Sequence, residues 1–288
     1  MFQPFEQERM MSKWENVVAY NLAESGVHPA TIYDLTQDRA FIEELLTTEL
    51  NYPQANGIIE LRERIAALYP GATPENLLVT VGCAEANYLT LHTLLQPGDE
   101  MVVMLPNYLQ IWGIAQNRGL RVKGFHLRPE QGWTPDLDEL EATVSDQTKL
   151  IAVCNPNNPT GYILTEAEMD AVVSAAERVG AWLLADEVYR GAERLTDTPT
   201  PSFWGRYDRV LATNGLSKAY GLPGLRIGWI VGPPGVVDDA WARHEYTTIG
   251  TTMLANKLAA LALSPEVQPR LTQRARDYIR QGFPILQE

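Results

Sequence analysis

Cysteine is scarce in this chain, which contains only Cys83 and Cys154. Two cysteines do not make the disulfide framework of a small secreted protein, and their spacing does not match that of metal ligands. The scarcity therefore favours a reducing, cytoplasmic environment, and we expect no metal site.

The sequence also has few positively charged residues relative to negatively charged ones. The 23 Lys and Arg residues are outnumbered by 36 Asp and Glu residues, which gives a formal net charge of −13. This balance argues against a nucleic-acid partner, which needs clustered Lys and Arg, but it allows one small phosphate in a local site. The sequence also lacks an apolar run long enough to cross a bilayer, and its first residues, Met1 to Glu6, do not resemble a signal peptide. We therefore expect no membrane partner.

Short apolar runs alternate regularly with helical patterns. Several runs are nearly continuous in Val, Ile, Leu and Ala, which is typical of strands that helices cover on both faces. The alternation indicates an α/β domain with a mostly parallel sheet. We predict a seven-stranded sheet from the runs Leu77–Val81, Met101–Met104, Val122–Leu127, Leu150–Cys154, Trp182–Ala185, Arg209–Thr213 and Ile227–Val231.

Helices are predicted between these strands. The segment Gly57–Tyr69 places Leu61 and Ile65 on one apolar face. Thr165 followed by Glu168 is a capping box, which predicts a helix that runs to Val179.

The two ends of the chain depart from this alternation. Val17–Leu22 predicts a strand that turns at Ser25-Gly26, Asp239–Leu263 predicts one long helix, and Glu266–Gly282 predicts another. We predict three parts: residues 1–45 as the N-terminal part of a small domain, residues 46–238 as the large α/β domain, and residues 239–288 as a linker helix with the truncated start of a C-terminal small domain.

The segment Ser217–Arg226 carries Lys218 after a predicted strand and Arg226 eight positions later. A lysine among apolar residues can lose its proton and form an imine with an aldehyde. A guanidinium can bind a phosphate through two parallel hydrogen bonds. Most single lysines are exposed surface residues, so the interpretation depends on what accompanies Lys218.

Two upstream segments accompany it. Asp186 ends an apolar run, and ligands of open α/β sheets bind at the carboxyl ends of strands, where this carboxylate could pair with a protonated pyridine nitrogen. Tyr189 and Asn158 could both donate to a phenolate oxygen. Each residue alone is an ordinary loop or turn residue. Together with Lys218 they form the set of residues needed to bind pyridoxal 5'-phosphate and to use it as an electron sink.

A phosphate site is predicted where Gly82-Cys83-Ala84 follows a strand and opens a helix. The first N–H groups of such a helix are free to bind an anion, and Arg226 would add a cation.

In this order, Asn155–Gly161, Asp186–Tyr189 and Ser217–Arg226 resemble the class I/II aminotransferases of the aspartate aminotransferase fold, which are fold type I pyridoxal phosphate enzymes. The resemblance extends from about Asn21 to the chain end. It implies that Lys218 is the imine lysine and proton shuttle and that Asp186 pairs with the pyridine nitrogen. The other cofactor-binding residues that it implies are Gly82, Cys83, Ala84, Asn158, Tyr189, Ser217 and Arg226.

Three further positions follow from the resemblance alone. Tyr108 matches the aromatic residue that stacks on the pyridine ring, and Gly26 matches a loop that touches substrate. Tyr52 matches a tyrosine that reaches the phosphate of a neighbouring subunit, so we expect a homodimer.

The chain departs from the family pattern at two places. Many members have Ser three residues before the lysine, where this chain has Gly215, so one phosphate hydrogen bond is expected to be missing. Members also continue beyond the helix that ends here, so the resemblance implies that the C-terminal small domain and its substrate-carboxylate arginine have no counterpart after Glu288.

The predicted function is transamination of an α-amino acid with a keto acid. A lyase or cyclase of amino-acid or specialised metabolism is an alternative, because the same cofactor residues serve those reactions. A shortened domain that binds cofactor without turnover is a second alternative.

Overall fold

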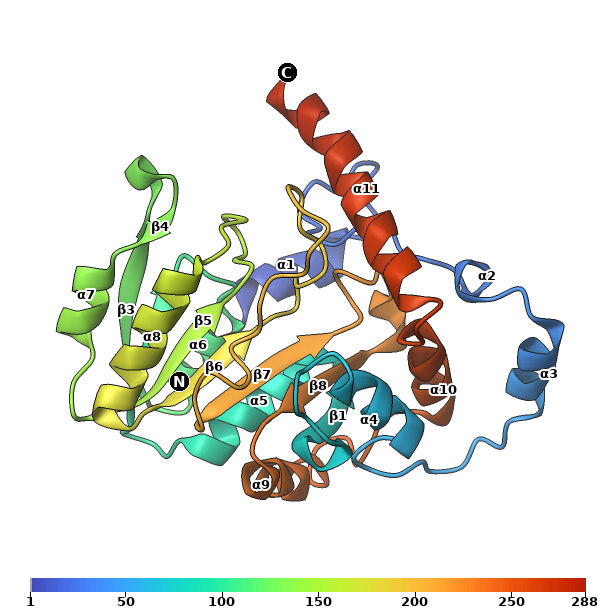
Figure 1. Ribbon diagram of the computed structural model, residues 1–288, viewed down its shortest axis with the longest axis horizontal. Coiled ribbons are helices and arrows are strands. Elements are labelled where there is room, and N and C mark those ends of the chain that lie inside the picture. The colour runs from blue at the N-terminus through green and yellow to red at the C-terminus, as the bar shows by residue number, and fades with distance from the viewer. Residues whose placement is uncertain (1) are drawn as a thin grey trace.

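One mixed sheet forms the centre of the computed structural model, which describes residues 2–288 (Figure 1). Within those residues it has eight strands in the order β1-β8-β7-β6-β5-β2-β3-β4, and β4 and β8 run antiparallel to their neighbours. The strands are β1 (Leu77–Val81), β2 (Glu100–Leu105), β3 (Arg121–Arg128), β4 (Thr134–Pro135), β5 (Thr148–Cys154), β6 (Trp182–Asp186), β7 (Val210–Gly215) and β8 (Ile227–Val231).

The prediction of a mostly parallel α/β sheet is confirmed, and all seven predicted runs are strands. The predicted number was one too low because β4 was missed. This strand has only two residues and pairs with the edge of β3 through Leu127 and Arg128. Two residues are too few to produce a periodic pattern.

Helices cover both faces of the sheet. Successive residues of a strand point to opposite faces, so each strand packs against both helix layers. In β7, Val210 and Ala212 face the layer of α4, α7, α8 and α10, whereas Leu211 faces the layer of α5 and α9. The helices are α1 (Glu6–Trp14), α2 (Ile32–Leu35), α3 (Arg39–Thr47), α4 (Ile59–Ala66), α5 (Gly82–Leu94), α6 (Gln110–Asn117), α7 (Leu137–Thr143), α8 (Glu166–Val179), α9 (Pro234–His244), α10 (Met253–Ala262) and α11 (Gln268–Gln287). The predicted capping box of α8 is confirmed: Thr165 and Glu168 each accept from the other's backbone N–H.

The parallel strands β1, β2, β5, β6 and β7 end at the same edge of the sheet, and the antiparallel β8 begins there. The register places Cys154 of β5 beside Asp186 of β6, and Asp186 beside Thr213 of β7. Polar residues that are distant in the sequence therefore meet at one edge.

The prediction of a strand at Val17–Leu22 was wrong. This segment consists of turns and bends, and Tyr20 and Leu22 are largely exposed. No strand among residues 2–288 pairs with it, and an unpaired strand has no ladder of hydrogen bonds to stabilise it. Instead, the N-terminal end forms α1, which lies across the carboxyl-terminal edge of the sheet (Figure 1).

The single helix predicted for Asp239–Leu263 is divided into α9 and α10. The interruption includes Ile249, whose φ of 66° is left-handed and ends helical geometry, and Thr252 then caps α10 by accepting from the N–H of Ala255. The predicted helix Glu266–Gly282 is α11, which is displaced towards the C-terminus. The predicted Gly57–Tyr69 helix is shorter, because Gly57 has a φ of 97° and α4 starts after it.

Candidate active site

A cavity of about 240 Å³ opens at the carboxyl-terminal edge of the sheet, where the loops after the parallel strands converge. Its floor and one wall come from the strand ends and the start of α5, and α1 with the segment after it forms the opposite wall. Nine residues predicted from the sequence line this cavity: Cys83, Ala84, Tyr108, Asn158, Asp186, Tyr189, Ser217, Lys218 and Arg226.

Asp186 ends β6 at the base of the cavity and is 5% exposed. Its Oδ2 accepts from Asn87 Nδ2 at 2.9 Å, its Oδ1 accepts from the N–H of Val188 at 3.1 Å, and the Sγ of Cys83 lies 3.8 Å away. Burial raises the pKa of Asp186 and outweighs these hydrogen bonds. A buried carboxylate of this kind is stabilised by a cationic partner.

The neighbouring carboxylate, Glu187, does not line the cavity. Its Oε1 accepts from Ser202 Oγ at 2.6 Å and from the N–H of Phe203 at 2.9 Å. The alternation of side chains at the strand end therefore separates the two acids, and only Asp186 faces the cavity.

Tyr189 and Asn158 lie together in the lining of the cavity. Asn158 Nδ2 donates to the Tyr189 hydroxyl at 3.1 Å, and that hydroxyl is 2.8 Å from the hydroxyl of Ser25. Burial raises the pKa of Tyr189, so the phenol keeps its proton at neutral pH and can donate it in a hydrogen bond. Two donors are thus directed at the same part of the cavity.

Arg226 lies against the start of α5. Its guanidinium donates to the carbonyl of Pro223 at 3.0 Å and contacts Ser217 Oγ at 3.4 Å. A Cβ added to Gly82 would lie 2.3 Å from Arg226 Nη2, so glycine is required for this approach. Among residues 2–288, the structure gives Arg226 no acidic partner. A guanidinium and an uncapped helix start thus adjoin, and both favour an anion.

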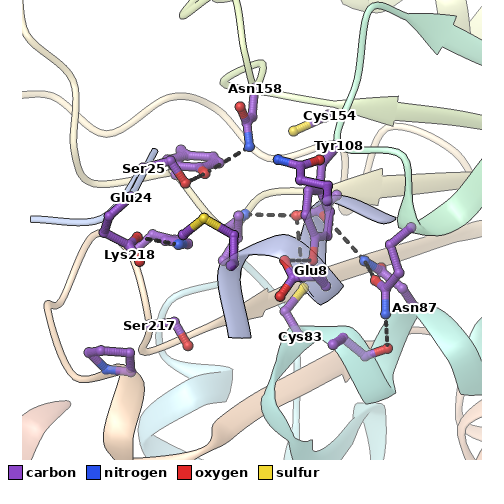
Figure 2. A pocket seen from close by; sticks show the side chains of 18 of the residues that line it. Glu8, Glu24, Ser25, Cys83, Asn87, Tyr108, Cys154, Asn158, Ser217 and Lys218 are labelled. Atoms are coloured by element: carbon purple, nitrogen blue, oxygen red, sulfur yellow. Dashed lines mark hydrogen bonds and ion pairs between the residues drawn. The ribbon is translucent and has the colours of Figure 1, made fainter. Parts of the chain in front are cut away.

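Lys218 reaches the opposite wall, where its Nζ donates to Glu24 Oε1 at 2.9 Å (Figure 2). The same oxygen accepts from the N–H of Gly26 at 2.5 Å. Burial alone would raise the pKa of Glu24, but the Lys218 ammonium and the Gly26 N–H outweigh it and hold that pKa below its usual value. The amine predicted to form the imine is therefore paired with a carboxylate that the sequence did not indicate.

Tyr108 follows β2 and connects the cavity to α1. Its hydroxyl donates to Glu8 Oε1 at 2.5 Å, and its ring lies 5.2 Å from that of Phe5 between centroids. Two hydrogen bonds between Gln3 and Asn117 hold the start of the same segment. Figure 2 shows the α1 ribbon crossing the cavity beside Glu8, between Lys218 and Asn87.

The structure gives a physical reason for glycine at position 215. A Cβ there would lie 2.9 Å from the carbonyl oxygen of Ile227 and 3.2 Å from the Cα of Gly228. Both are backbone atoms of the paired strand β8, so a serine would require the two strands to separate.

Three predicted positions lie outside the lining. Gly82 directly precedes the lining residue Cys83 at the start of α5. Gly26 borders the cavity, because a Cβ added to it would be 3.6 Å from Lys218 Cδ. Tyr52 does not line the cavity and is 87% exposed, in the segment between α3 and α4. Its role towards a second subunit stays a prediction.

Four residues whose side chains hydrogen-bond to side chains of the predicted site were not predicted: Glu8, Glu24, Ser25 and Asn87. Of these, Asn87 could have been found from the sequence. It lies among apolar residues of α5, and a buried side-chain amide needs a hydrogen-bond partner. Glu8, Glu24 and Ser25 lie in exposed segments, where the sequence has no periodicity that indicates what they touch.

The chain matches the family Aminotransferase class I and II over residues 31–281 and belongs to that family. Family members use pyridoxal phosphate, as the resemblance of the sequence implied. A solved structure of a PLP-dependent aminotransferase from Streptococcus suis superimposes with a TM-score of 0.92 at 33% identity, covering 99% of this chain and 76% of that one.

Curated relatives include capreomycidine synthase of Streptomyces vinaceus, which is 35% identical over 88% of this chain and 66% of that protein. Arginine–pyruvate transaminase of Pseudomonas aeruginosa is 32% identical over 68% of this chain and 51% of that protein. The chain therefore spans between about half and two thirds of the length of these relatives.

The cavity residues fit pyridoxal phosphate. The buried Asp186 suits a protonated ring nitrogen, Asn158 and Tyr189 suit a ring oxygen, and the guanidinium at the α5 start suits a phosphate. Among residues 2–288, no cluster of His, Cys, Asp or Glu could hold a metal ion. In the same range, no helix is long and apolar enough to cross a membrane.

Proposed function

We propose that this chain is the cofactor-binding part of a pyridoxal-phosphate-dependent aminotransferase that acts on an α-amino acid through Lys218. The observation that carries the proposal is the convergence of Lys218, Asp186 and Arg226 on one cavity from three different strand ends. A lysine, a buried acid and an anion site at the carboxyl edge of a sheet meet the chemical needs of an aldehyde, a ring nitrogen and a phosphate.

When bound, the cofactor would supply an aldehyde for an amine and a conjugated ring that withdraws electrons from the substrate Cα. Asp186 would hold the proton on the ring nitrogen, and Asn158 with Tyr189 would orient the ring by donating to its oxygen. Arg226, Ser217 and the Gly82–Ala84 helix start would bind the phosphate, and Tyr108 would cover the ring. Lys218 Nζ would move the proton at the substrate Cα.

A cyclase or lyase of amino-acid metabolism is the second candidate. It is supported by the relative named capreomycidine synthase, which matches 88% of this chain. The side chains of the cavity floor serve either reaction, because reaction type depends on how the substrate Cα bonds are oriented.

We also propose a homodimer in which Tyr52 contacts the phosphate site of the second copy. The 87% exposure of Tyr52 is compatible with this role. We further propose that the chain divides into three parts after residues 45 and 238. This division is supported by contacts between the two ends of the chain: Arg274 and Arg270 of α11 donate to the carbonyls of His28 and Leu35.

The test is a half-reaction. Purified protein loaded with pyridoxal phosphate would be mixed with each standard amino acid in the absence of a keto acid. Conversion of the cofactor absorbance, with one equivalent of keto acid released, supports transamination. Release of ammonia or of a cyclised product supports the second candidate. A constant spectrum with every amino acid supports cofactor binding without turnover.

A further inference from the structure

The segment Glu24-Ser25-Gly26 contacts two of the proposed functional residues. Glu24 accepts from Lys218 Nζ at 2.9 Å, and Ser25 lies 2.8 Å from the Tyr189 hydroxyl. The Gly26 N–H donates to Glu24 at 2.5 Å and fixes the direction of the carboxylate. Three consecutive residues of an otherwise irregular segment are thus attached to the cavity.

As an ammonium the Lys218 nitrogen carries three N–H donors, but bonded to an aldehyde carbon it carries at most one, so attachment to the cofactor competes with this ion pair. The lone pair that attacks an aldehyde is not available while the nitrogen is an ammonium that donates to a carboxylate. The side chains of Lys218 and Glu24 are 26% and 42% exposed, so their attraction is screened only in part. Hydrogen bonds also hold the pKa of Glu24 below its usual value, so it is charged at neutral pH.

We propose that Glu24 is a positioning residue that holds the Lys218 amine whenever this amine is not bonded to the cofactor. Glu24 would then oppose the attachment of Lys218 to the cofactor. It would also keep the released amine beside the cavity after a substrate amine has replaced it. This inference rests on the proposed function for its catalytic meaning, but the contact itself is testable without cofactor.

The chain offers a matched control. Lys257 Nζ contacts Glu44 at 2.6 Å, and its side chain is also 26% exposed, but the pair does not line the cavity. The first experiment treats cofactor-free protein with a limiting amount of an acetylating reagent at fixed pH. The labelling of each lysine is measured by peptide mass mapping relative to Lys149. The variants are Glu24→Gln, Glu24→Ala and Glu44→Gln.

Glu24→Gln keeps an oxygen that can accept from Gly26 but removes the charge. We expect it to raise the labelling of Lys218 roughly twofold to fivefold. Glu24→Ala should raise this labelling at least as much, and the labelling of Lys257 should not change in either variant. Glu44→Gln should raise only Lys257. Unchanged labelling of Lys218 in both Glu24 variants, while Glu44→Gln raises Lys257, would overturn the proposal.

The second experiment adds pyridoxal phosphate at a limiting concentration, followed by borohydride, and measures the fraction of Lys218 that carries the reduced cofactor. Glu24→Gln should increase this fraction and weaken the apparent binding of an unreactive amino-acid analogue by a similar factor. A decrease in the fraction would contradict the proposal. Attachment of the cofactor to another lysine in the wild-type protein would instead refute the proposed function, and the cofactor-free result would still decide the contact with Glu24.

Discussion

The two walls of the cavity are built in different ways. The sheet wall, defined here by Asn87, Asp186 and Arg226, grows out of strand ends and the start of α5, and Asn87 and Asp186 are buried. The N-terminal wall, defined by Glu8, Glu24 and Ser25, consists of exposed residues that single hydrogen bonds attach to the rest of the site. We therefore propose that the sheet wall would hold the cofactor, whereas the N-terminal wall would adjust the groups around it.

The largest expected effect is on the sheet wall. Asp186→Ala removes the proposed partner of the ring nitrogen, and loss of one member of a buried charged pair costs about 3–5 kcal/mol. If that cost falls on the reaction barrier, turnover decreases about a thousandfold. The measurement is single-turnover conversion of a cofactor-loaded variant. Glu187→Gln, which alters the adjacent acid outside the cavity, is the control, and equal losses in the two variants would contradict the role of Asp186.

A smaller effect is expected at the phosphate end of the sheet wall. Arg226→Ala removes a guanidinium from the α5 start, and charge-assisted hydrogen bonds contribute about 1.5–3 kcal/mol. Affinity for pyridoxal phosphate should therefore fall roughly tenfold to hundredfold, as measured by equilibrium dialysis. Arg274→Ala, whose guanidinium binds loop carbonyls outside the cavity, should leave the affinity unchanged. Unchanged affinity in Arg226→Ala would place the phosphate elsewhere.

The hydrogen bonds of Glu85, which hold the start of α5 at the sheet wall, should make the free energy of unfolding depend on pH. Glu85 lies in the first turn of α5 and accepts from the N–H of Val81 at 2.7 Å and from Thr247 Oγ1 at 2.7 Å. Burial alone would raise its pKa, but its hydrogen bonds, led by that to His244, lower it to about 2.

Because this pKa is below that of the unfolded chain, its stabilisation is present above about pH 4.5 and is lost as the pH falls towards 2. Glu85→Gln should therefore reduce the free energy of unfolding by about 1–2 kcal/mol at pH 7, allowing for solvent screening, and by much less near pH 2. Denaturant unfolding at several pH values measures the difference. If the difference in the free energy of unfolding between the wild type and Glu85→Gln stays constant with pH, the lowered pKa of Glu85 is not its cause.

The smallest expected effect is on the N-terminal wall. Glu8→Gln weakens the hydrogen bond from Tyr108, and loss of charge in one hydrogen bond of an exposed pair costs about 1 kcal/mol or less. Amide hydrogen exchange in α1 should accelerate up to about fivefold, while exchange in β6 stays unchanged. Glu6→Gln, on the same helix, serves as the control. Equal acceleration in α1 and β6 would mean that the two walls are one cooperative unit.

The same contrast explains how much could be predicted from the sequence. The sheet wall was predictable because β5, β6 and β7 are apolar runs whose ends locate Asn158, Asp186 and Lys218 at one edge. The lysine, acid and arginine also occur in ordered motifs. Two features were missed. The two-residue strand β4 is defined by pairing to a neighbour and not by periodicity, and the contact of Asn87 with Asp186 joins residues 99 positions apart.

The N-terminal wall was not predictable by this means. The mostly apolar segment Val17–Leu22 suggested a strand, but a strand requires a pairing partner, and the structure provides none for this segment among residues 2–288. The ion pair between Glu24 and Lys218 joins residues 194 positions apart, and only the three-dimensional arrangement brings them together.

The most direct test of the central claim, that this cavity holds pyridoxal phosphate through Lys218, is reductive trapping. The protein would be incubated with pyridoxal phosphate, reduced with borohydride, digested and mapped by mass spectrometry, with Lys218→Ala as the comparison. We predict that the reduced cofactor is found on the peptide that contains Lys218 and that the variant carries none. Label on Lys13, Lys123, Lys149 or Lys257 in place of Lys218, or no label at all, would contradict it.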